Sequence, residues 1–264
     1  MKNTISLFLI FLSIVLVACN PSNAGKSGEN AGADTLKGKE AHVKTDGAIL
    51  PGLDHGMEQS PINISSSTND KGHHKVSLYF KDSINKVENL GHTVQLDFNE
   101  GSTITQDDTL FNFKQCHFHT PSEHHIDGMS FPMEMHIVSM MPDTNKKDTP
   151  QYLVISALFK EGKESKFIAD FLSSIPKNEN EKEAVPTGQV KLSDLFGSVS
   201  AELMGQYYYY RGSLTTPPYT ESVRWHVTKH IFEASPEQIE AIHKIEGNNA
   251  RQVQATFGRV VAND

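Results

Sequence analysis

Alternating apolar and polar positions dominate the chain after Gln59 and predict β-strands with one buried face. The segment 152–159 is apolar almost throughout, which predicts a central strand. The predicted strands are Val76–Phe80, Val94–Phe98, Phe111–His119, Glu134–Met140, Tyr152–Phe159, Tyr207–Tyr210 and Ser222–Val227.

Helical patterns are confined to two segments, Phe167–Ile175 and Pro236–Ile245. Ser235 is a natural N-cap residue before Pro236 at the first helical position, and Gly247 ends the second helix. Many strands and few short helices predict a mainly β domain built on a large sheet. A length of 264 residues and a hydrophobic fraction of 37% favour one soluble globular domain.

The first part of the chain has the pattern of an export signal rather than of a folded domain. Lys2 precedes an apolar run at 5–17, so residues 1–18 are expected to form a signal peptide. Leu16-Val17-Ala18-Cys19 resembles the lipobox of bacterial lipoproteins, in which the cysteine becomes the lipidated first residue. Ordinary cleavage nearby, which leaves a free Cys19, is the alternative. We therefore expect an exported, membrane-anchored lipoprotein on the periplasmic or cell-surface side.

The segment after the lipobox contains scarcely any large apolar side chain, so residues 19–46 are expected to be a flexible tether and residues 47–264 the folded domain. The net charge of −8 and the lack of a basic run give no electrostatic reason to bind nucleic acid. Cys116 is the only cysteine after Cys19, so the fold must be stabilised by its core.

Metal-binding side chains concentrate between Gln115 and His136, where five of the 13 histidines and two glutamates fall. On a strand, His117 and His119 project from the same face, about 6.6 Å apart. His136 on a neighbouring strand would add a third nitrogen. Three neutral histidines and a water form the open shell of a catalytic zinc site.

Strand alternation also places Gln115 beside His117 and Glu134 beside His136. Both side chains can accept the ring N–H that a metal ligand does not use, which fixes the tautomer of each ring. Two alternatives remain open from this stretch alone. The His-x-His pair could be ordinary surface or core histidine, or His117, His119, Glu123 and His136 could bind iron or manganese as in cupins.

Motifs spread along the chain resemble the α-class carbonic anhydrases, and the resemblance covers about residues 57–262. It implies a single domain, mainly β with a few short helices, around a large, mostly antiparallel twisted sheet. The motifs are Gln59–Asn63, Asn89–His92, Gln115–His119, Ser122–His124, Glu134–His136, Gly212–Pro218 and Asn248–Arg251.

The resemblance implies that His117, His119 and His136 bind Zn²⁺. Gln115 and Glu134 would orient two of these ligands, and the Asn249 carbonyl would support His119. His124 matches a structural position of the family.

Catalytic roles follow from the same resemblance. Glu123 would accept a hydrogen bond from the Thr215 hydroxyl and so orient the zinc-bound hydroxide that attacks carbon dioxide, while Thr216 helps to position bicarbonate. His92 matches the residue that returns the proton to solvent, a role that suits an imidazole because it titrates near neutral pH. The apolar wall for carbon dioxide would consist of Val138, Val154, Leu214 and Trp225.

The chain also departs from the family pattern. Residues 44–58 contain no aromatic residue, where the family usually has a Trp and Tyr segment that closes one side of the site. Tyr219 stands where many bacterial members have a disulfide cysteine, and Cys116 replaces a usual Phe.

Two functions remain possible. The first is an exported carbonate dehydratase, a zinc lyase that reversibly hydrates carbon dioxide to bicarbonate and a proton. The alternative is a catalytically silent surface binding module on the same fold. Expected partners are carbon dioxide and bicarbonate, the membrane through lipidated Cys19, and a second copy in a homodimer.

Overall fold

The computed structural model describes residues 44–45, 48–49, 56–81, 84–142, 149–197, 199 and 205–264. The predicted signal peptide, Cys19 and the tether up to residue 43 lie outside these residues. Lys44–Thr45 (β1) pairs antiparallel with Ala48–Ile49 (β2) in a separate two-stranded sheet. No helix within the described ranges is long and apolar enough to cross a membrane.

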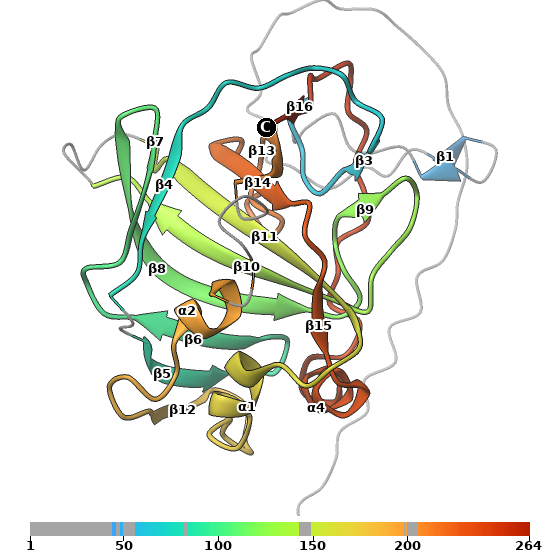
Figure 1. Cartoon of the computed structure of the whole chain (residues 1–264). Coiled ribbons are helices and arrows are strands. Elements are labelled where there is room, and N and C mark those ends of the chain that lie inside the picture. The colour runs from blue at the N-terminus through green and yellow to red at the C-terminus, as the bar shows by residue number, and fades with distance from the viewer. Residues whose placement is uncertain are drawn as a thin grey trace, which may run out of the picture. The chain divides into compact units, whose positions relative to one another are not determined.

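Twelve of the described strands form one large sheet, in which β12, β5, β6, β8, β10, β11, β14, β13 and β16 follow one another (Figure 1). Strand β15 pairs with β11, and β7 pairs with both β4 and β8. The strands are β4 (Val76–Tyr79), β5 (Ile84–Asn89), β6 (Val94–Phe98), β7 (Thr103–Gln106), β8 (Thr109–His119), β10 (Met133–Met140), β11 (Tyr152–Glu161), β12 (Glu181–Ala184), β13 (Tyr207–Gly212), β14 (Val223–Thr228), β15 (Phe232–Ala234) and β16 (Ala262–Asn263).

The seven predicted strands are all present, with ends shifted by a few residues, and the mainly β prediction is confirmed. Most pairs are antiparallel, but β11 runs parallel to both β14 and β15, so the sheet is mixed. The central place predicted for β11 is also confirmed, since it lies between β10 and β14 and its residues 153–159 are buried. A second small sheet pairs β3 (Asn63–Ile64) with β9 (His125–Ile126) in parallel.

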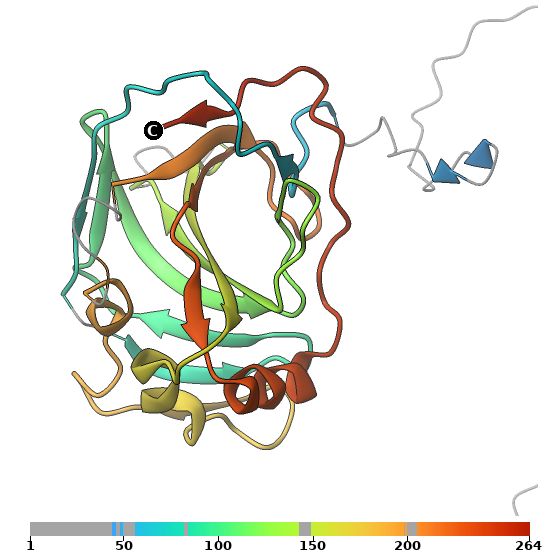
Figure 2. The ribbon, with the colours of Figure 1, turned by 45° about the vertical axis from the view of Figure 1, so that its right-hand side comes forward.

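Three described helices pack against one face of the large sheet (Figures 1 and 2). They are α1 (Lys166–Leu172), α2 (Leu192–Phe196) and α4 (Pro236–Glu246). Helix α4 begins as predicted: Ser235 and Gln238 form a capping box, and Gly247 follows the last helical residue. The apolar faces of the helices pack against the strands in the larger of two hydrophobic clusters.

The two faces of β8 differ in what they contact. Cys116 and Phe118 are fully buried in the helix-covered core. His117, between them, and His119, after Phe118, therefore project from the opposite face. That opposite face also carries the smaller hydrophobic cluster around Trp225. The candidate metal ligands thus stand on the face of the central strands that lies opposite the helices.

Candidate metal centre

The three predicted histidine ligands meet on two adjacent antiparallel strands. His117 and His119 lie on β8, and His136 on β10 stands directly opposite His117. The ring centres are 5.0 Å apart for His117 and His119, 5.3 Å for His117 and His136, and 4.5 Å for His119 and His136. One nitrogen from each ring lies within 4.8 Å of the others, so the three side chains can converge on one ion.

Hydrogen bonds fix the tautomers of two of these rings. The Nδ1 atom of His117 lies 2.8 Å from the Gln115 Oε1, and the Nε2 atom of His136 lies 2.6 Å from the Glu134 Oε1. An amide or carboxylate oxygen can only accept, so these two ring nitrogens carry the protons. His117 therefore presents Nε2 and His136 presents Nδ1 as a free lone pair.

His119 differs because neither of its ring nitrogens has a hydrogen-bond partner among the described residues, although the residue is only 4% exposed. The expected bond to the Asn249 carbonyl is therefore absent, and that prediction was wrong. Asn249 instead holds the backbone on both sides of His119: its Nδ2 donates to the Phe118 carbonyl at 3.1 Å, and its Oδ1 accepts from the Thr120 N–H at 3.0 Å.

Burial keeps the three rings neutral. It lowers the pKa of His117 to about 3 and that of His119 well below the ordinary value, and neighbouring imidazoles lower both further. Burial also lowers the pKa of His136, although the Glu134 carboxylate opposes this shift. Near pH 7 each ring therefore keeps a lone pair for a metal ion.

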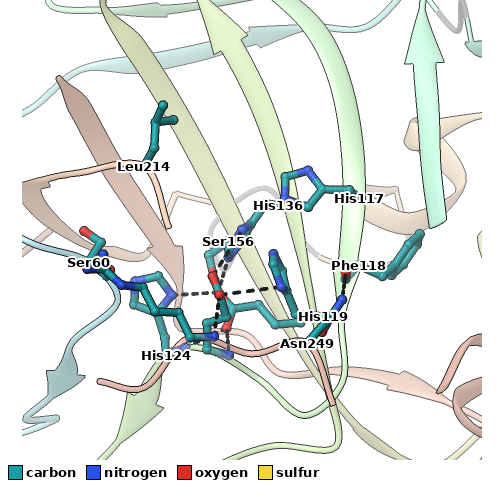
Figure 3. Close-up of polar contacts among 12 residues, drawn as sticks. Ser60, His117, Phe118, His119, His124, His136, Ser156, Leu214 and Asn249 are labelled. Carbon is teal, nitrogen blue, oxygen red and sulfur yellow. Dashed lines mark hydrogen bonds and ion pairs between the residues drawn. The ribbon is translucent and has the colours of Figure 1, made fainter. Parts of the chain in front are cut away.

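Glu134 is the polar centre of the site, and Figure 3 labels three of the residues that contact it, His124, His136 and Ser156. Its Oε1 atom accepts from His136 Nε2 at 2.6 Å, from His124 Nδ1 at 2.6 Å and from Ser156 Oγ at 2.7 Å. Its Oε2 accepts from the backbone N–H groups of Glu123 and His124 at 2.8 and 2.7 Å. Burial alone would raise the pKa of Glu134, but His124 and His136 lower it well below its ordinary value. The carboxylate therefore stays ionised inside the protein.

Glu123 lies beside the ligands and is 1% exposed. Its Oε1 atom accepts from the Arg251 N–H at 2.9 Å and lies 3.6 Å from His119 Nδ1. Burial and the nearby Glu134 raise the pKa of Glu123 to about 8, while Arg251 and the Thr215 hydroxyl act in the opposite direction. Glu123 belongs to neither group of candidate ligand atoms in the described residues, which disfavours the cupin arrangement.

The apolar residues predicted to line the substrate pocket lie together in the smaller hydrophobic cluster. Val138 on β10 stands opposite Val154 on β11, and Val154 stands opposite Trp225 on β14. Leu214 packs against the same cluster from the loop after β13. This row runs parallel to the row that carries His117 and His136, so an apolar wall adjoins the histidines.

Comparison with known proteins decides the family. The sequence model of the eukaryotic-type carbonic anhydrases matches residues 50–264. The chain belongs to the α-carbonic anhydrase family. A carbonic anhydrase of Neisseria gonorrhoeae is 37% identical over 211 residues, covering 78% of this chain and 77% of that protein. One from Pectobacterium carotovorum is 35% identical over 207 residues, covering 78% and 80%.

Solved structures agree with this assignment to the α-carbonic anhydrases. The α-carbonic anhydrase of Thermovibrio ammonificans, solved with the inhibitor sulfanilamide, superposes with a TM-score of 0.70 at 34% identity, covering 78% of this chain and 87% of that one. The named relatives and the structures together assign the chain to the carbonate dehydratases, so it is an enzyme.

The donor set of this carbonic anhydrase chain fits zinc. Zn²⁺ binds imidazole nitrogens at about 2.0–2.1 Å, and three histidines leave one position open in a catalytic site. A buried polar atom without a partner costs about 1–3 kcal/mol, so the His119 ring nitrogen that keeps its lone pair marks a place where a bound ion would satisfy the protein. A second group, His124, Glu134 and His136, also has close ligand atoms, but hydrogen bonds among them already account for it.

The remaining predicted site residues lie around this centre. His92 is exposed at the tip of the hairpin between β5 and β6, and its Nδ1 lies 2.9 Å from the Leu90 carbonyl. Thr215 is 9% exposed, whereas Thr216 beside it is exposed. Cys116 is a buried free thiol on the other face, as expected from strand alternation.

Two contacts of this site were missed at the sequence level. Ser156 reaches Glu134 from β11, and Tyr210 on β13 places its hydroxyl 2.6 Å from His124 Nε2. Tyr210 in turn lies 3.0 Å from Ser60 Oγ. The only available signal for Ser156 was a lone polar residue inside an apolar strand, which needs a hydrogen-bond partner when buried.

Proposed function

We propose that this carbonic anhydrase catalyses the reversible hydration of carbon dioxide to bicarbonate and a proton with one Zn²⁺ held by His117, His119 and His136. The observation that carries this proposal is the meeting of three neutral imidazoles, whose ligand atoms lie within 4.8 Å of one another, beside an apolar wall. A bound Zn²⁺ supplies a strong nucleophile at neutral pH by lowering the pKa of water; carbonic anhydrase is the standard example of this effect.

The apolar wall binds the substrate. Carbon dioxide carries no charge, so a surface of Val138, Val154, Leu214 and Trp225 can hold it next to the metal without offering a competing ligand. Trp225 also packs edge-on against His136, with ring centres 4.8 Å apart, which restricts that ligand from the side of the wall.

Glu123 and Thr215 orient the reacting oxygen. Within the site the Glu123 Oε1 accepts from the Arg251 N–H, and its Oε2 is buried without a hydrogen-bond partner among the described residues, which leaves an acceptor for the Thr215 hydroxyl. A Thr215 hydroxyl that donates to Glu123 has only lone pairs left to offer the nucleophile, so it selects one orientation of that oxygen. Thr216, exposed beside it, helps to position bicarbonate.

His92 returns the proton to solvent. A carbonyl oxygen can only accept, so the contact with the Leu90 carbonyl places the proton of neutral His92 on Nδ1. Nε2 is then the atom that takes a proton from the site and releases it to buffer. The exposed position at a hairpin tip allows this exchange with solvent.

The deciding experiment combines metal analysis with stopped-flow hydration of carbon dioxide. The protein from residue 19 onward, with Cys19→Ser, is expected to contain one zinc per chain and to hydrate carbon dioxide. His119→Ala is expected to lose both, whereas His73→Ala, on an exposed residue, should change neither. A zinc-loaded protein without hydration activity would instead support the silent binding module. Iron in place of zinc would support the cupin-type metal site.

We also propose that residues 1–18 are a signal peptide, that Cys19 is lipidated and that residues 19–46 tether the domain to a membrane on the periplasmic or cell-surface side. Support comes from the lipobox-like Leu16-Val17-Ala18-Cys19 sequence. Cys19→Ser should move the protein out of the detergent phase, and unchanged partition would refute lipidation. The homodimer stays a prediction that sedimentation analysis can decide.

A further inference from the structure

We propose that Ser156 is a positioning residue of the metal centre, which holds the Glu134 carboxylate in place and through it keeps His136 aimed at zinc. The proposal rests on the zinc site described above, but nothing in the family motifs concerns Ser156. It lies on β11 directly opposite His136 on β10, and its Oγ is 2.7 Å from the Glu134 Oε1 (Figure 3).

The placement of Ser156 is unusual for its strand. Residues 153–159 are apolar apart from Ser156, and all of them are buried. A hydroxyl in such a position costs stability unless it forms a hydrogen bond. Because the acceptor is an ionised carboxylate, the bond is charge-assisted, and 2.7 Å is typical of such bonds. Ser156 therefore has one strong partner, and that partner also binds a metal ligand.

The number of donors around Glu134 shows what Ser156 adds. Five donors contact the carboxylate, from His136, His124, Ser156 and two backbone N–H groups. A carboxylate offers about four lone-pair sites, so every site is occupied and rotation of the group would break at least one bond. Two donors to Oε1 are imidazole nitrogens, whose positions depend on two rotatable side-chain bonds each. The third donor, the Ser156 Oγ, is joined to the central strand β11 through only one rotatable bond.

Loss of this donor should lower the affinity of the site for zinc. Ser156→Ala removes the hydroxyl with almost no change of volume, and Glu134 gains freedom to turn away from His136. Partners that orient a metal ligand typically contribute 10–100-fold to metal affinity. Since His124 remains on Glu134 Oε1, we expect the lower end of this range, a roughly tenfold faster release of zinc.

The chain provides a matched control in Ser139. This serine lies on β10, three residues after His136, and is also 0% exposed, but its Oγ has no hydrogen-bond partner among the described residues. Ser139→Ala removes the same group from the same sheet without touching Glu134. Ser156→Cys is a second variant, in which a thiol of similar size keeps only a weak donor.

Zinc release into excess chelator is the readout, followed by the visible spectrum of the cobalt-substituted proteins. Ser156→Ala should release zinc about tenfold faster and shift the cobalt bands, Ser156→Cys should be intermediate, and Ser139→Ala should match wild type. Wild-type release rates in Ser156→Ala, or equal acceleration in Ser139→Ala, would overturn the proposal. Both measurements omit carbon dioxide, so a wild-type protein that binds zinc without hydrating carbon dioxide would refute the proposed function and leave this test intact.

Discussion

The guanidinium carbon of Arg251 lies 3.8 Å from the centre of the Tyr219 ring. Arg251 also donates through its backbone N–H to Glu123 and through Nη1 to the Gln59 Oε1 at 3.0 Å. Tyr219 belongs to the loop that carries Thr215. This stacked pair therefore joins the Glu123 side of the site to the Thr215 loop.

Tyr219→Ala should loosen this junction. A cation over an aromatic face contributes about 0.5–1 kcal/mol at exposed sites and about 2 kcal/mol when desolvated, so we expect a loss of about 1 kcal/mol in the free energy of unfolding. The turnover rate should fall as well, because the Thr215 loop gains freedom. Urea unfolding and stopped-flow hydration measure both effects. Tyr219→Phe keeps the ring face and serves as the control; an equal loss in both variants would argue against the stacked pair.

Thr215 should affect catalysis without affecting the metal. Thr215→Ala removes the hydroxyl that we propose orients the reacting oxygen, and misplacement of a reacting group by about 1 Å can cost about 100-fold in rate. We therefore expect a turnover rate lower by about that factor, with zinc content unchanged. Thr215→Ser keeps the hydroxyl and should recover most of the rate. A Thr215→Ala enzyme as fast as wild type would remove Thr215 from the mechanism.

His92→Ala should slow turnover only when proton transfer limits it. In dilute buffer the variant should be slower than wild type, and added imidazole should partly restore the rate because it carries the proton in place of the side chain. Zinc content and the rate in concentrated buffer should match wild type. Identical rates at every buffer concentration would show that His92 is not the shuttle.

The buried Glu246 side chain should give the free energy of unfolding an unusual dependence on pH. It is the last residue of α4 and is 7% exposed. Burial raises its pKa to about 8, although the Val94 N–H and the hydroxyls of Thr120 and Thr93 oppose the shift. Between pH 4.5 and 8 the folded protein thus holds a proton on Glu246 that the unfolded chain releases. Its contribution to stability is present below pH 4.5 and is lost as pH rises towards 8.

The comparison with Glu246→Gln isolates this contribution, because the amide is similar in shape and does not titrate. The free energy of unfolding of wild type, relative to the variant, should fall between pH 4.5 and 8 by at most about 1.4 kcal/mol per pH unit. Denaturant unfolding at several pH values measures it. A difference that stays constant over this window would show that Glu246 ionises normally in the folded protein.

Strand alternation was sufficient to place most of the candidate metal centre. A period of two residues puts His117 and His119 on one face of β8, and it puts Gln115 and Glu134 next to the rings that they contact. The pattern also separated Cys116 from the ligands. These relationships lie within one strand or between β8 and β10, which are neighbours in the sheet joined by residues 120–132, so they follow from strand alternation once the two strands pair.

Strand alternation could not predict contacts between segments that are distant in the sequence. The parallel pairing of β11 with β14 brings Val154 to Trp225, and periodicity carries no information about which strands become neighbours. The bonds of Ser156, and those of Asn249 to the backbone beside His119, depend on that assembly. Strand β12 was missed for a different reason: all four of its side chains are exposed, so no apolar alternation marks it.

The burial of Cys116 makes the thiol an internal reporter of sheet opening. It is 0% exposed between β6 and β10 and next to His117 in the chain, and burial raises its pKa far above the ordinary value. A thiol-specific reagent reacts with the thiolate, so it can label Cys116 only after these strands separate. In a Cys19→Ser background, the labelling rate would measure how often the ligand-bearing strand opens, without any introduced probe.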